Sequence, residues 1–457
     1  MVATRSFVAP LLRIAGPVAL ARLGIIGMAL ADVIVVGQLA PDELPHQALG
    51  WAPTAVFLVA AIGLLQGVQV LAARSIGEGN KLGAGVVLRR GLVLALIAGA
   101  LSAALMWLGG ERLFTIFGID ESLAGPSTPV MRVLAFSIPL HLLYIAGTFF
   151  LEAIKKPGIS TVVMWLANGV NLGLNLLWVP EHGAIGSAWA TVGARVFLAG
   201  LLLICIFFLR DGVDYGVRKG KGAKGAGYGA LLAVGAAAAV SQAVEAGAFS
   251  AMTVIAGRIS ADVVAAYQIL LNLMAFVFMI ALGLAAATAV LVSEAIGRGT
   301  PHDAARAGWT GIWLNVIGMA IAAALILVFA NQLGRAYTAD ISLAALIASL
   351  MWICALVLVP DGTQVVAASG LRARSDNWFP TFSHILAYAG VMPVLGYWLA
   401  EHQHMGVKGL LFAIFISSVV SAVVLLLRWW AIADKPAKAI APEEPVAGLV
   451  EGEVRDR

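Results

Sequence analysis

Three acidic residues lie well inside long apolar stretches of the sequence. They are Asp32, Glu245 and Asp361. An ionisable side chain at the centre of a lipid-spanning helix costs about 2.5–3.5 kcal/mol, so it normally faces a cavity or a partner. A carboxyl group in such a setting can take up and release a proton, or bind a sodium ion together with nearby carbonyl and amide oxygens. These residues are therefore candidates for ion binding.

The neighbours of two of these acids favour cation binding. Pro360 directly precedes Asp361, and a proline inside a helix frees a carbonyl of the preceding turn. Gln242 and Ser241 lie three and four residues before Glu245, on the same helix face. The alternative is that the acids form ion pairs with arginines inside the apolar stretches, which are Arg22, Arg132 and Arg195.

Amide side chains form a second group of candidates. Asn168, Asn171 and Asn175 follow one another at i, i+3 and i+7, and Gln268 and Asn272 at i and i+4, so each set lies on a single helix face. Such amides either join helices by hydrogen bonds or line a hydrated cavity, and we favour the cavity.

Pro17 follows Gly16 and lies about four turns before Asp32, inside the same apolar stretch. Proline in a helix interior predicts a kink. The kink is either a static bend or a hinge that couples the state of Asp32 to bending of the helix.

The elements that must position these residues are membrane-spanning helices. Of the 457 residues, 61% are hydrophobic and 12% are charged, whereas a soluble domain has about 25% charged residues. About 20 apolar residues span the hydrocarbon layer as a helix. We therefore predict an all-α membrane protein with twelve transmembrane helices, at about 10–36, 51–73, 87–109, 127–152, 159–179, 184–209, 229–257, 264–292, 305–330, 341–370, 378–399 and 407–430.

The loops carry basic residues asymmetrically. Four lie on one side, namely Arg112, Arg258, Arg335 and Lys408. The other side has a much larger set, consisting of Arg74, Lys81, Arg89, Arg90, Lys155, Lys156, Arg210, Arg218, Lys219, Lys221, Lys224, Arg298, Arg306, Arg372 and Arg374. The positive-inside rule places the larger set and both termini in the cytoplasm of a multi-pass inner-membrane protein.

The sequence also indicates an internal repeat. Residues 63–80 (GLLQGVQVLAARSIGEGN) and 283–300 (GLAAATAVLVSEAIGRGT) align with an offset of 220. Two six-helix lobes in the same membrane orientation follow, as in transporters built from parallel repeats with a cavity between them. We expect an N-lobe at 1–210, a cytoplasmic linker at 211–228, a C-lobe at 229–431 and a disordered cytoplasmic tail at 432–457.

Several kinds of site are absent from the sequence. There is no GxxxxGK[ST] motif for ATP and no HExxH motif for an intramembrane enzyme. Cys205 and Cys354 are isolated in apolar stretches, which indicates buried hydrophobic side chains, and His402 and His404 lie in a loop. We therefore expect no enzyme activity, no cofactor and no bound transition metal.

The order of these residues resembles the multidrug and toxic compound extrusion (MATE) family, in particular its NorM-type bacterial branch. The resemblance covers about residues 10–430. Its first half includes Pro17, Asp32, AARSIGEGN (72–80), the Asn171/Asn175 pair and GAIGSAWAT (183–191). Its second half includes Glu245 with Phe249, AYQILLN (266–272), SEAIGRG (293–299) and DGTQVVAASGLR (361–372).

The resemblance implies an antiporter that exports small organic compounds, often cations, in exchange for protons or sodium. It implies that Asp32 is the coupling carboxylate of the N-lobe, with Pro17 as the hinge. Glu245 and Asp361 match the C-lobe cation site, which could hold sodium. The implied cavity-lining residues are Asn171, Asn175, Thr191, Gln268 and Asn272.

Some relatives have an acid where this sequence has Asn175, which shifts the weight of a sodium site to Glu245 and Asp361. Small organic cations and the lipid bilayer are the expected partners, with no nucleic acid, and we expect a monomer. One alternative function is a lipid-linked saccharide flippase of the same superfamily, because three arginines lie inside the spans. A membrane-embedded enzyme or channel is the other, and the repeat argues against it.

Overall fold

The computed structural model describes residues 6–116, 121–218, 224–338 and 340–437. The predicted tail therefore lies outside the described residues from 438 onward, as do linker residues 219–223. Every regular element in the described part of the chain is helical. The helices are α1 (Val8–Leu39), η1 (Pro41–Glu43), α2 (Leu44–Gly77), α3 (Lys81–Gly109), α4 (Glu111–Ile116), α5 (Glu121–Ala153), α6 (Gly158–Phe207), α7 (Tyr228–Ile259), α8 (Ala261–Gly297), α9 (Pro301–Val328), α10 (Ala330–Tyr337), α11 (Ile341–Ala373), α12 (Trp378–His384), η2 (Ile385–Val391), α13 (Met392–Tyr397), η3 (Trp398–His402) and α14 (Val407–Ile432).

Among the described residues, 11 continuous helices are long and apolar enough to span a membrane. One of them, α6, has 50 residues, more than twice the length that one crossing needs. Its backbone is not helical at Gly183, where φ is 54° and ψ is −134°. Only glycine adopts this conformation without strain, so α6 consists of two helices joined at Gly183.

Side-chain contacts show that α6 folds back at this glycine. Asn175 and Thr191 both bind the carboxylate of Asp32. In a straight helix these two residues, 16 positions apart, would lie about 24 Å from each other. The chain must therefore reverse between them. Because α6 crosses the membrane twice, the 11 helices of the described residues make twelve crossings, as the sequence predicts.

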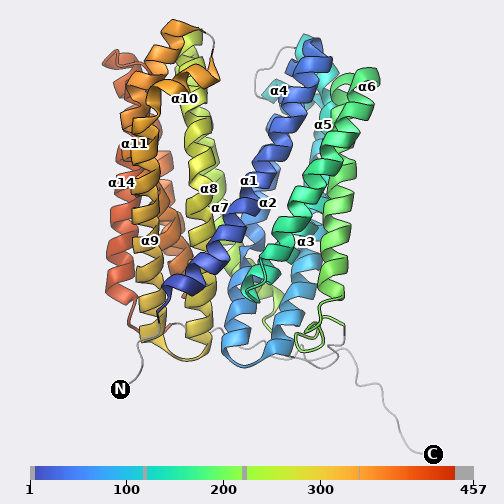
Figure 1. Ribbon diagram of the computed structural model, residues 1–457, viewed down its shortest axis with the longest axis vertical. Coiled ribbons are helices and arrows are strands. Elements are labelled where there is room, and N and C mark those ends of the chain that lie inside the picture. The colour runs from blue at the N-terminus through green and yellow to red at the C-terminus, as the bar shows by residue number, and fades with distance from the viewer. Residues whose placement is uncertain (1–5, 117–120, 219–223, 339, 438–457) are drawn as a thin grey trace, which may run out of the picture.

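The helices form two groups that diverge towards one end of the molecule (Figure 1). We call α1–α6 the N-lobe and α7–α14 the C-lobe. The end that carries α4 and α10, where the groups lie apart in Figure 1, is the open end. The opposite end, where α2 and α8 terminate side by side, is the closed end.

Two helix pairs join the lobes along their length. In one pair, α1 packs on α8, and a Cβ added to Gly283 would lie 2.5 Å from the carbonyl oxygen of Ala15. In the other, α7 packs on α2, and a Cβ added to Gly63 would lie 2.7 Å from the Cα of Ala239. Glycine at these crossings lets the backbones approach closely. Gly63 and Gly283 are 220 residues apart, so both lobes use the same position for this purpose.

At the closed end, α2 and α8 cross at a pair of glycines. A Cβ on Gly77 would lie 2.1 Å from the carbonyl oxygen of Glu294, and a Cβ on Gly297 would lie 2.2 Å from the carbonyl oxygen of Arg74. Each contact becomes the other when 220 is added to or subtracted from its residue numbers. The lobes therefore meet here as a pseudo-symmetric pair.

Side chains beside this crossing also form two contacts whose residue numbers are related by 220. The Arg74 guanidinium donates to Ser375 Oγ at 2.9 Å, while Lys155 Nζ lies 2.5 Å from Glu294 Oε2. Lys155 and Ser375 both have a positive φ, of 61° and 67°. We call these two contacts and the Gly77/Gly297 crossing the clasp. The clasp holds the closed end together across the lobe boundary.

Hydrogen bonds inside the lobes also recur at the offset of 220. Thr161 Oγ1 donates to the carbonyl oxygen of Pro17 at 2.7 Å, and Thr381 Oγ1 donates to that of Ala237 at 2.7 Å. The predicted hinge Pro17 thus lies in α1 with its carbonyl held by the first half of α6. These equivalences support the internal repeat that the sequence indicates.

Three details differ from the sequence-based expectation. Arg74 and Arg372 are assigned to loops by the sequence, but both are buried inside helices α2 and α11. The short helices α4 and α10 at the open end are not predicted, since neither is long enough to show a clear period. The span predicted at 378–399 is interrupted by two π-helical segments, η2 and η3.

Candidate functional site

Asp32 of α1 is surrounded by neutral donors from both halves of α6. Asn171 and Asn175 each donate a side-chain N–H to Asp32 Oδ1, at 2.9 and 2.7 Å. Thr191 donates its hydroxyl to Oδ2 at 2.8 Å. The carboxylate is completely buried. Charge-assisted hydrogen bonds of this kind are about twice as strong as neutral ones, so they stabilise a carboxylate that is buried away from solvent.

The asparagine stripe of α6 has two different roles. Asn168, at its first position, donates to the carbonyl oxygen of Gly24 at 3.0 Å and so joins α6 to the backbone of α1. The other two asparagines bind Asp32, so all three join α6 to α1 by hydrogen bonds. Asn171, Asn175 and Thr191 are buried, and none of them lines the cavity between the lobes described below. Their role as cavity-lining residues stays a prediction.

No basic side chain of the described residues lies within 4.0 Å of the Asp32 carboxylate, so the ion-pair alternative does not hold for this acid. Arg195 is buried nearby and interacts with it electrostatically. Its guanidinium donates to Ser137 at 2.7 Å and stacks on the Trp51 ring at 5.2 Å. The N-lobe site is therefore one acid held by three uncharged side chains.

In the C-lobe, Asp361 of α11 accepts hydrogen bonds from two hydroxyls. Tyr388 of η2 and Ser418 of α14 both donate to its Oδ1 at 3.1 Å. This set of carboxylate and hydroxyl oxygens has the donor type that a hard cation such as sodium prefers. Groups of three or more His, Cys, Asp or Glu that could hold a metal are absent from the described residues.

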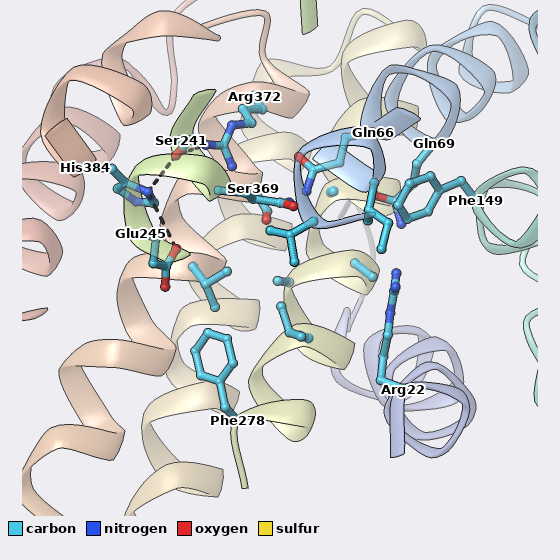
Figure 2. A pocket seen from close by; sticks show the side chains of 18 of the residues that line it. Arg22, Gln66, Gln69, Phe149, Ser241, Glu245, Phe278, Ser369, Arg372 and His384 are labelled. Carbon is cyan, nitrogen blue, oxygen red and sulfur yellow. Dashed lines mark hydrogen bonds and ion pairs between the residues drawn. The ribbon is translucent and has the colours of Figure 1, made fainter. Parts of the chain in front are cut away.

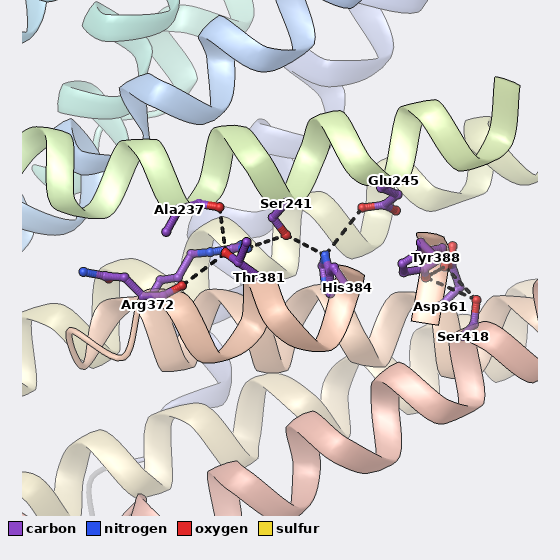
Figure 3. Close-up of polar contacts among 10 residues, drawn as sticks. Ala237, Ser241, Glu245, Asp361, Arg372, Thr381, His384, Tyr388 and Ser418 are labelled. Carbon is purple, nitrogen blue, oxygen red and sulfur yellow. Dashed lines mark hydrogen bonds and ion pairs between the residues drawn. The ribbon is translucent and has the colours of Figure 1, made fainter. Parts of the chain in front are cut away.

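Glu245 of α7 lies in the same polar row, shown in Figure 3. Its Oε2 is 4.0 Å from Nδ1 of His384, whose Nδ1 is in turn 2.6 Å from Ser241 Oγ. The guanidinium of Arg372 donates to the same Ser241 oxygen at 2.8 Å. Asp361 is near enough to interact with Glu245 electrostatically. The structure thus brings both predicted C-lobe acids together.

A cavity of about 370 Å³ lies between the lobes. Figure 2 shows Glu245 and Arg372 on its C-lobe side, facing Arg22 and Gln69 on its N-lobe side. Its apolar walls include the aromatic rings of α5, α7 and α8, which are Phe149, Phe249 and Phe278. The cavity combines apolar surface with a few charged groups, which is typical of small-molecule sites.

Behind the cavity wall lies a further acid, which the sequence analysis does not single out. Glu152 of α5 is completely buried, accepts a hydrogen bond from Gln69 and lies 4.0 Å from the Arg22 guanidinium. It is the last residue of the predicted span 127–152, and α5 ends one residue later, at Ala153. An acid within a predicted span was the available signal.

Ser241, which the sequence places on the same helix face as Glu245, completes the site together with His384 and Arg372, for which no role in the site is predicted. His384 lies inside a predicted span, so a titratable residue in an apolar stretch was the available signal. Arg372 was counted among the loop residues because the predicted span ended at 370. Helix ends are the least certain part of such a prediction.

The remaining predicted residues lie elsewhere. Gln268 and Asn272 are exposed on α8, where Gln268 donates to Thr253 at 3.1 Å, and neither lines the cavity described above. Their role as lining residues stays a prediction. Arg132 stacks on Trp107 at 5.2 Å, away from all three acids.

Comparison with known proteins supports one family throughout. The MatE family model matches residues 17–177 and 237–398, two segments that begin 220 residues apart. A protein of Caulobacter vibrioides named probable multidrug resistance protein NorM is 41% identical over 426 residues, covering 92% of this chain and 90% of the relative. The multidrug resistance protein PmpM of Pseudomonas aeruginosa is 28% identical over 437 residues, covering 92% and 90%.

Solved structures agree on the fold. A multidrug resistance MATE family transporter of the MOP superfamily, in an outward-facing conformation, superposes with a TM-score of 0.87 at 20% identity, covering 95% of this chain and 98% of that chain. The eukaryotic MATE transporter AtDTX14 superposes with a TM-score of 0.84 at 17% identity, covering 94% and 97%. The chain therefore belongs to the MatE family and is a multi-pass membrane transporter rather than an enzyme.

Proposed function

We propose that this transporter exports small organic compounds, often cations, in exchange for protons or sodium by alternating access. The observation that carries the proposal is the Asp32 site. A completely buried carboxylate whose hydrogen-bond donors are all neutral has no permanent counter-ion within bonding distance. Binding of a proton or a cation supplies the missing charge, which is the property that a coupling site needs.

The central cavity is the proposed substrate site. Its aromatic and aliphatic walls suit hydrophobic compounds of varied shape, and Glu245 places a negative group in contact with them. The multidrug names of the relatives support an organic substrate range of this kind.

The conformation is proposed to be outward-open. The clasp closes the end at which Lys155 and Arg74 lie, and the positive-inside rule assigns these residues to the cytoplasm. The open end then faces outward, with both termini cytoplasmic and the chain acting as a monomer in the inner membrane. Transport requires the clasp to open and the lobes to close at the other end.

Pro17 is proposed as the hinge of this motion. It lies within the part of α1 that packs on α8, between Ala15 and Ala19, and Asp32 follows about four turns later on the same helix. Proline lacks the N–H that would bond to the carbonyl of the preceding turn, and the bond from Thr161 to the Pro17 carbonyl ties α6 to α1 at this weakened point. A change of charge at Asp32 can therefore reach the lobe boundary through α1.

The driving force is sufficient for concentrative export. One elementary charge crossing 100 mV supplies about 2.3 kcal/mol. This free energy supports a concentration ratio of roughly 50-fold.

Efflux of a fluorescent cationic dye from vesicles tests the proposal. The protein is reconstituted, and a pH gradient and a sodium gradient are imposed separately on wild type and on Asp361→Asn. We expect one gradient to drive efflux in the wild type and the variant to lose it. Failure of both gradients with several dyes would contradict antiport, and normal transport by Asp361→Asn would contradict the C-lobe assignment.

A lipid-linked saccharide flippase is the second candidate, because Arg22 and Arg372 line the cavity and could contact a pyrophosphate. Both arginines have an acidic neighbour, Glu152 and Glu245 respectively, which reduces their availability for an anionic substrate. Replacement of Arg22 by Gln separates the candidates. A dye exporter would retain a substantial part of its transport, whereas a flippase would lose lipid translocation.

A further inference from the structure

His384 occupies a junction in the C-lobe. It is the last residue of α12, immediately before the π-helical segment η2, and is 2% exposed. Its Nδ1 lies 4.0 Å from Glu245, and its ring meets that of Tyr388 edge-on at 5.6 Å. Tyr388 donates to Asp361 at 3.1 Å. The imidazole therefore lies beside Glu245, and the ring of Tyr388 separates it from Asp361.

The hydrogen bonds around His384 indicate its neutral tautomer. Arginine can only donate, so the bond from Arg372 occupies a lone pair of Ser241 Oγ and leaves the hydroxyl hydrogen for another acceptor. That acceptor is Nδ1 of His384, 2.6 Å away. The ring proton then resides on Nε2, which has no hydrogen-bond partner in the described part of the chain. Nδ1 has a single lone pair, which accepts from the Ser241 hydroxyl, while the Glu245 oxygen at 4.0 Å lies beyond hydrogen-bond distance. A protonated Glu245 that moves closer can donate to this lone pair in place of the hydroxyl.

We propose that Glu245 and His384 share one exchangeable proton, and that this pair makes the C-lobe proton-coupled rather than sodium-coupled. The proposal rests on the proposed antiport function and deepens it. A proton from the cavity binds the Glu245 carboxylate, whose side chain is 21% exposed. The protonated carboxyl group then closes the present gap of 4.0 Å and donates to Nδ1, while the Ser241 hydroxyl turns its hydrogen away, so that the acid and the neutral imidazole share the proton. Loss of the proton to the cavity reverses both steps.

The charged and titratable groups around the pair favour a proton over a metal cation. Arg372 and Asp361 face it from α11, Tyr388 faces it from η2, and Arg22 lies across the cavity on α1. The guanidinium of Arg372 reaches the pair through Ser241 and adds positive charge, which opposes a bound metal cation at Glu245. The nearest polar group of Glu245 is a ring nitrogen, whereas hard cations prefer oxygen, and the hydroxyls of Tyr388 and Ser418 bind Asp361 instead.

The backbone next to His384 fits this role. A π-helical turn is wider than an α-helical one and occurs frequently at functional sites. Segment η2 (Ile385–Val391) begins directly after His384 and carries Tyr388. The extra residue in the turn changes the direction in which the two side chains project, so that His384 meets α7 while Tyr388 meets Asp361 and Ser418.

The test uses reconstituted full-length protein, a fluorescent cationic dye and a series of internal pH values, with a pH gradient or a sodium gradient. His384→Gln keeps a polar side chain of similar length but cannot exchange a proton. We expect it to lower pH-driven efflux by about tenfold, the change that 1.4 kcal/mol produces. The rate that remains should have lost the wild-type dependence on pH. Dye affinity is measured by fluorescence in detergent, so that a change in dye binding is separated from the loss of pH dependence.

The matched control is His141→Gln. His141 of α5 is buried to the same degree, with an unpartnered Nδ1, and no carboxylate of the described residues lies within 4.0 Å of it. The control should keep the wild-type pH profile. Ser241→Ala provides a second variant in case His384→Gln does not fold, because loss of the Nδ1 partner should also displace the profile.

The outcomes separate two failures. Wild-type efflux driven by sodium but not by a pH gradient would overturn the proton assignment, as would a His384→Gln profile that matches the wild type. Absence of wild-type efflux under both gradients would overturn the proposed antiport function and this assignment with it. An equal effect of His141→Gln would overturn the specific role of His384.

Discussion

The two lobes share a backbone but bury their acids in different ways. The N-lobe holds Asp32 completely buried among two amides and a hydroxyl. The C-lobe holds Glu245 at the edge of the cavity, with the network of His384 behind it. One site is closed and uncharged around its acid, and the other is open and contains further titratable groups. Duplication of a helical scaffold therefore does not require duplication of its chemistry.

Some charges at equivalent positions are inverted between the lobes. Among residues 74–156 and their equivalents 220 positions later, opposite charges occur in four pairs, which are Arg74 and Glu294, Glu78 and Arg298, Glu152 and Arg372, and Lys156 and Asp376. Gly77 and Gly297 lie against each other at the closed end, so residues near the pseudo-twofold axis approach their own equivalents. Like charges there would repel, whereas opposite charges attract. A single chain with two independent halves can carry opposite charges at such positions.

The largest expected effect is a difference between variants of Asp32 in the N-lobe and of Glu245 in the C-lobe. Asp32→Asn places a permanently neutral side chain among donors that favour a carboxylate, so we expect gradient-driven efflux to fall to background. Dye binding in the cavity should persist, because Asp32 does not line it. Glu245→Gln should impair both binding and efflux. Efflux and dye affinity, measured on both variants, check this difference, and equal profiles would contradict it.

The donors around each acid give the next effect. Thr191→Val removes one donor from a completely buried carboxylate, which costs about 1–3 kcal/mol. Ser418→Ala should cost less, because Tyr388 still donates to Asp361 and that site is partly exposed. Thermal unfolding in detergent compares the two variants. A larger loss for Ser418→Ala would mean that the C-lobe acid depends more on its donors.

The clasp tests how equivalent the lobes are where they meet. Alanine at Gly77 or Gly297 forces backbones apart that now approach too closely for a Cβ, and overpacking of this kind costs about 1–3 kcal/mol. Both variants should open the closed end by the same amount, which distances between spin labels across that end would reveal. Gly318→Ala in α9, with nothing within 4 Å of the added Cβ, is the control. Unequal effects would show that the two glycine contacts match in geometry but contribute differently to the stability of the closed end.

The smallest effect concerns exposed ion pairs with inverted charges. Lys156 lies 2.7 Å from Asp211, and Arg428 lies 2.8 Å from Asp376. The hydrogen bond and charge of Lys156 lower the pKa of Asp211 below its ordinary value of 3.8. A lowered carboxyl pKa stabilises the folded state above the ordinary value, and this stabilisation is lost as the pH falls below it.

Lys156→Met should therefore reduce thermal stability slightly at pH 7 and have no effect at a pH low enough to protonate Asp211. Melting curves of wild type and variant at both pH values check this expectation. Surface ion pairs contribute little to stability in general. A large loss of thermal stability at pH 7 would therefore contradict this expectation and indicate that Lys156 does more than pair with Asp211 at the start of the linker.

Much of the fold could be predicted from local properties. Helix number, the repeat and the burial of Asp32 follow from apolar runs and from the cost of burying a charge. The amides Asn171 and Asn175 were found because a helix places residues three to four apart on one face. Gly183 lies between the predicted spans 159–179 and 184–209, and the structure breaks α6 into two helices at this glycine.

The site was only partly predictable, because its partners come from distant helices. Ser241 and His384 are 143 residues apart, and Asp32 and Thr191 are 159 apart. No spacing in the sequence relates such pairs, and Thr191 was named only through the family resemblance. Arg372 was missed because α11 extends to Ala373, beyond the predicted span that ends at 370. Glu152 is the last residue of its predicted span, and nothing in the sequence indicates that Gln69 and Arg22 lie beside it.

The sequence by itself determined that this chain crosses the membrane twelve times, in two related halves with acids at their centres, because hydrophobicity and helical period are local. The tertiary structure alone decided which neighbours each acid has, and therefore what each can bind. It placed neutral donors around Asp32 and an imidazole beside Glu245. Electrostatic free energies depend on distance and burial in space, and these are set only when the helices pack.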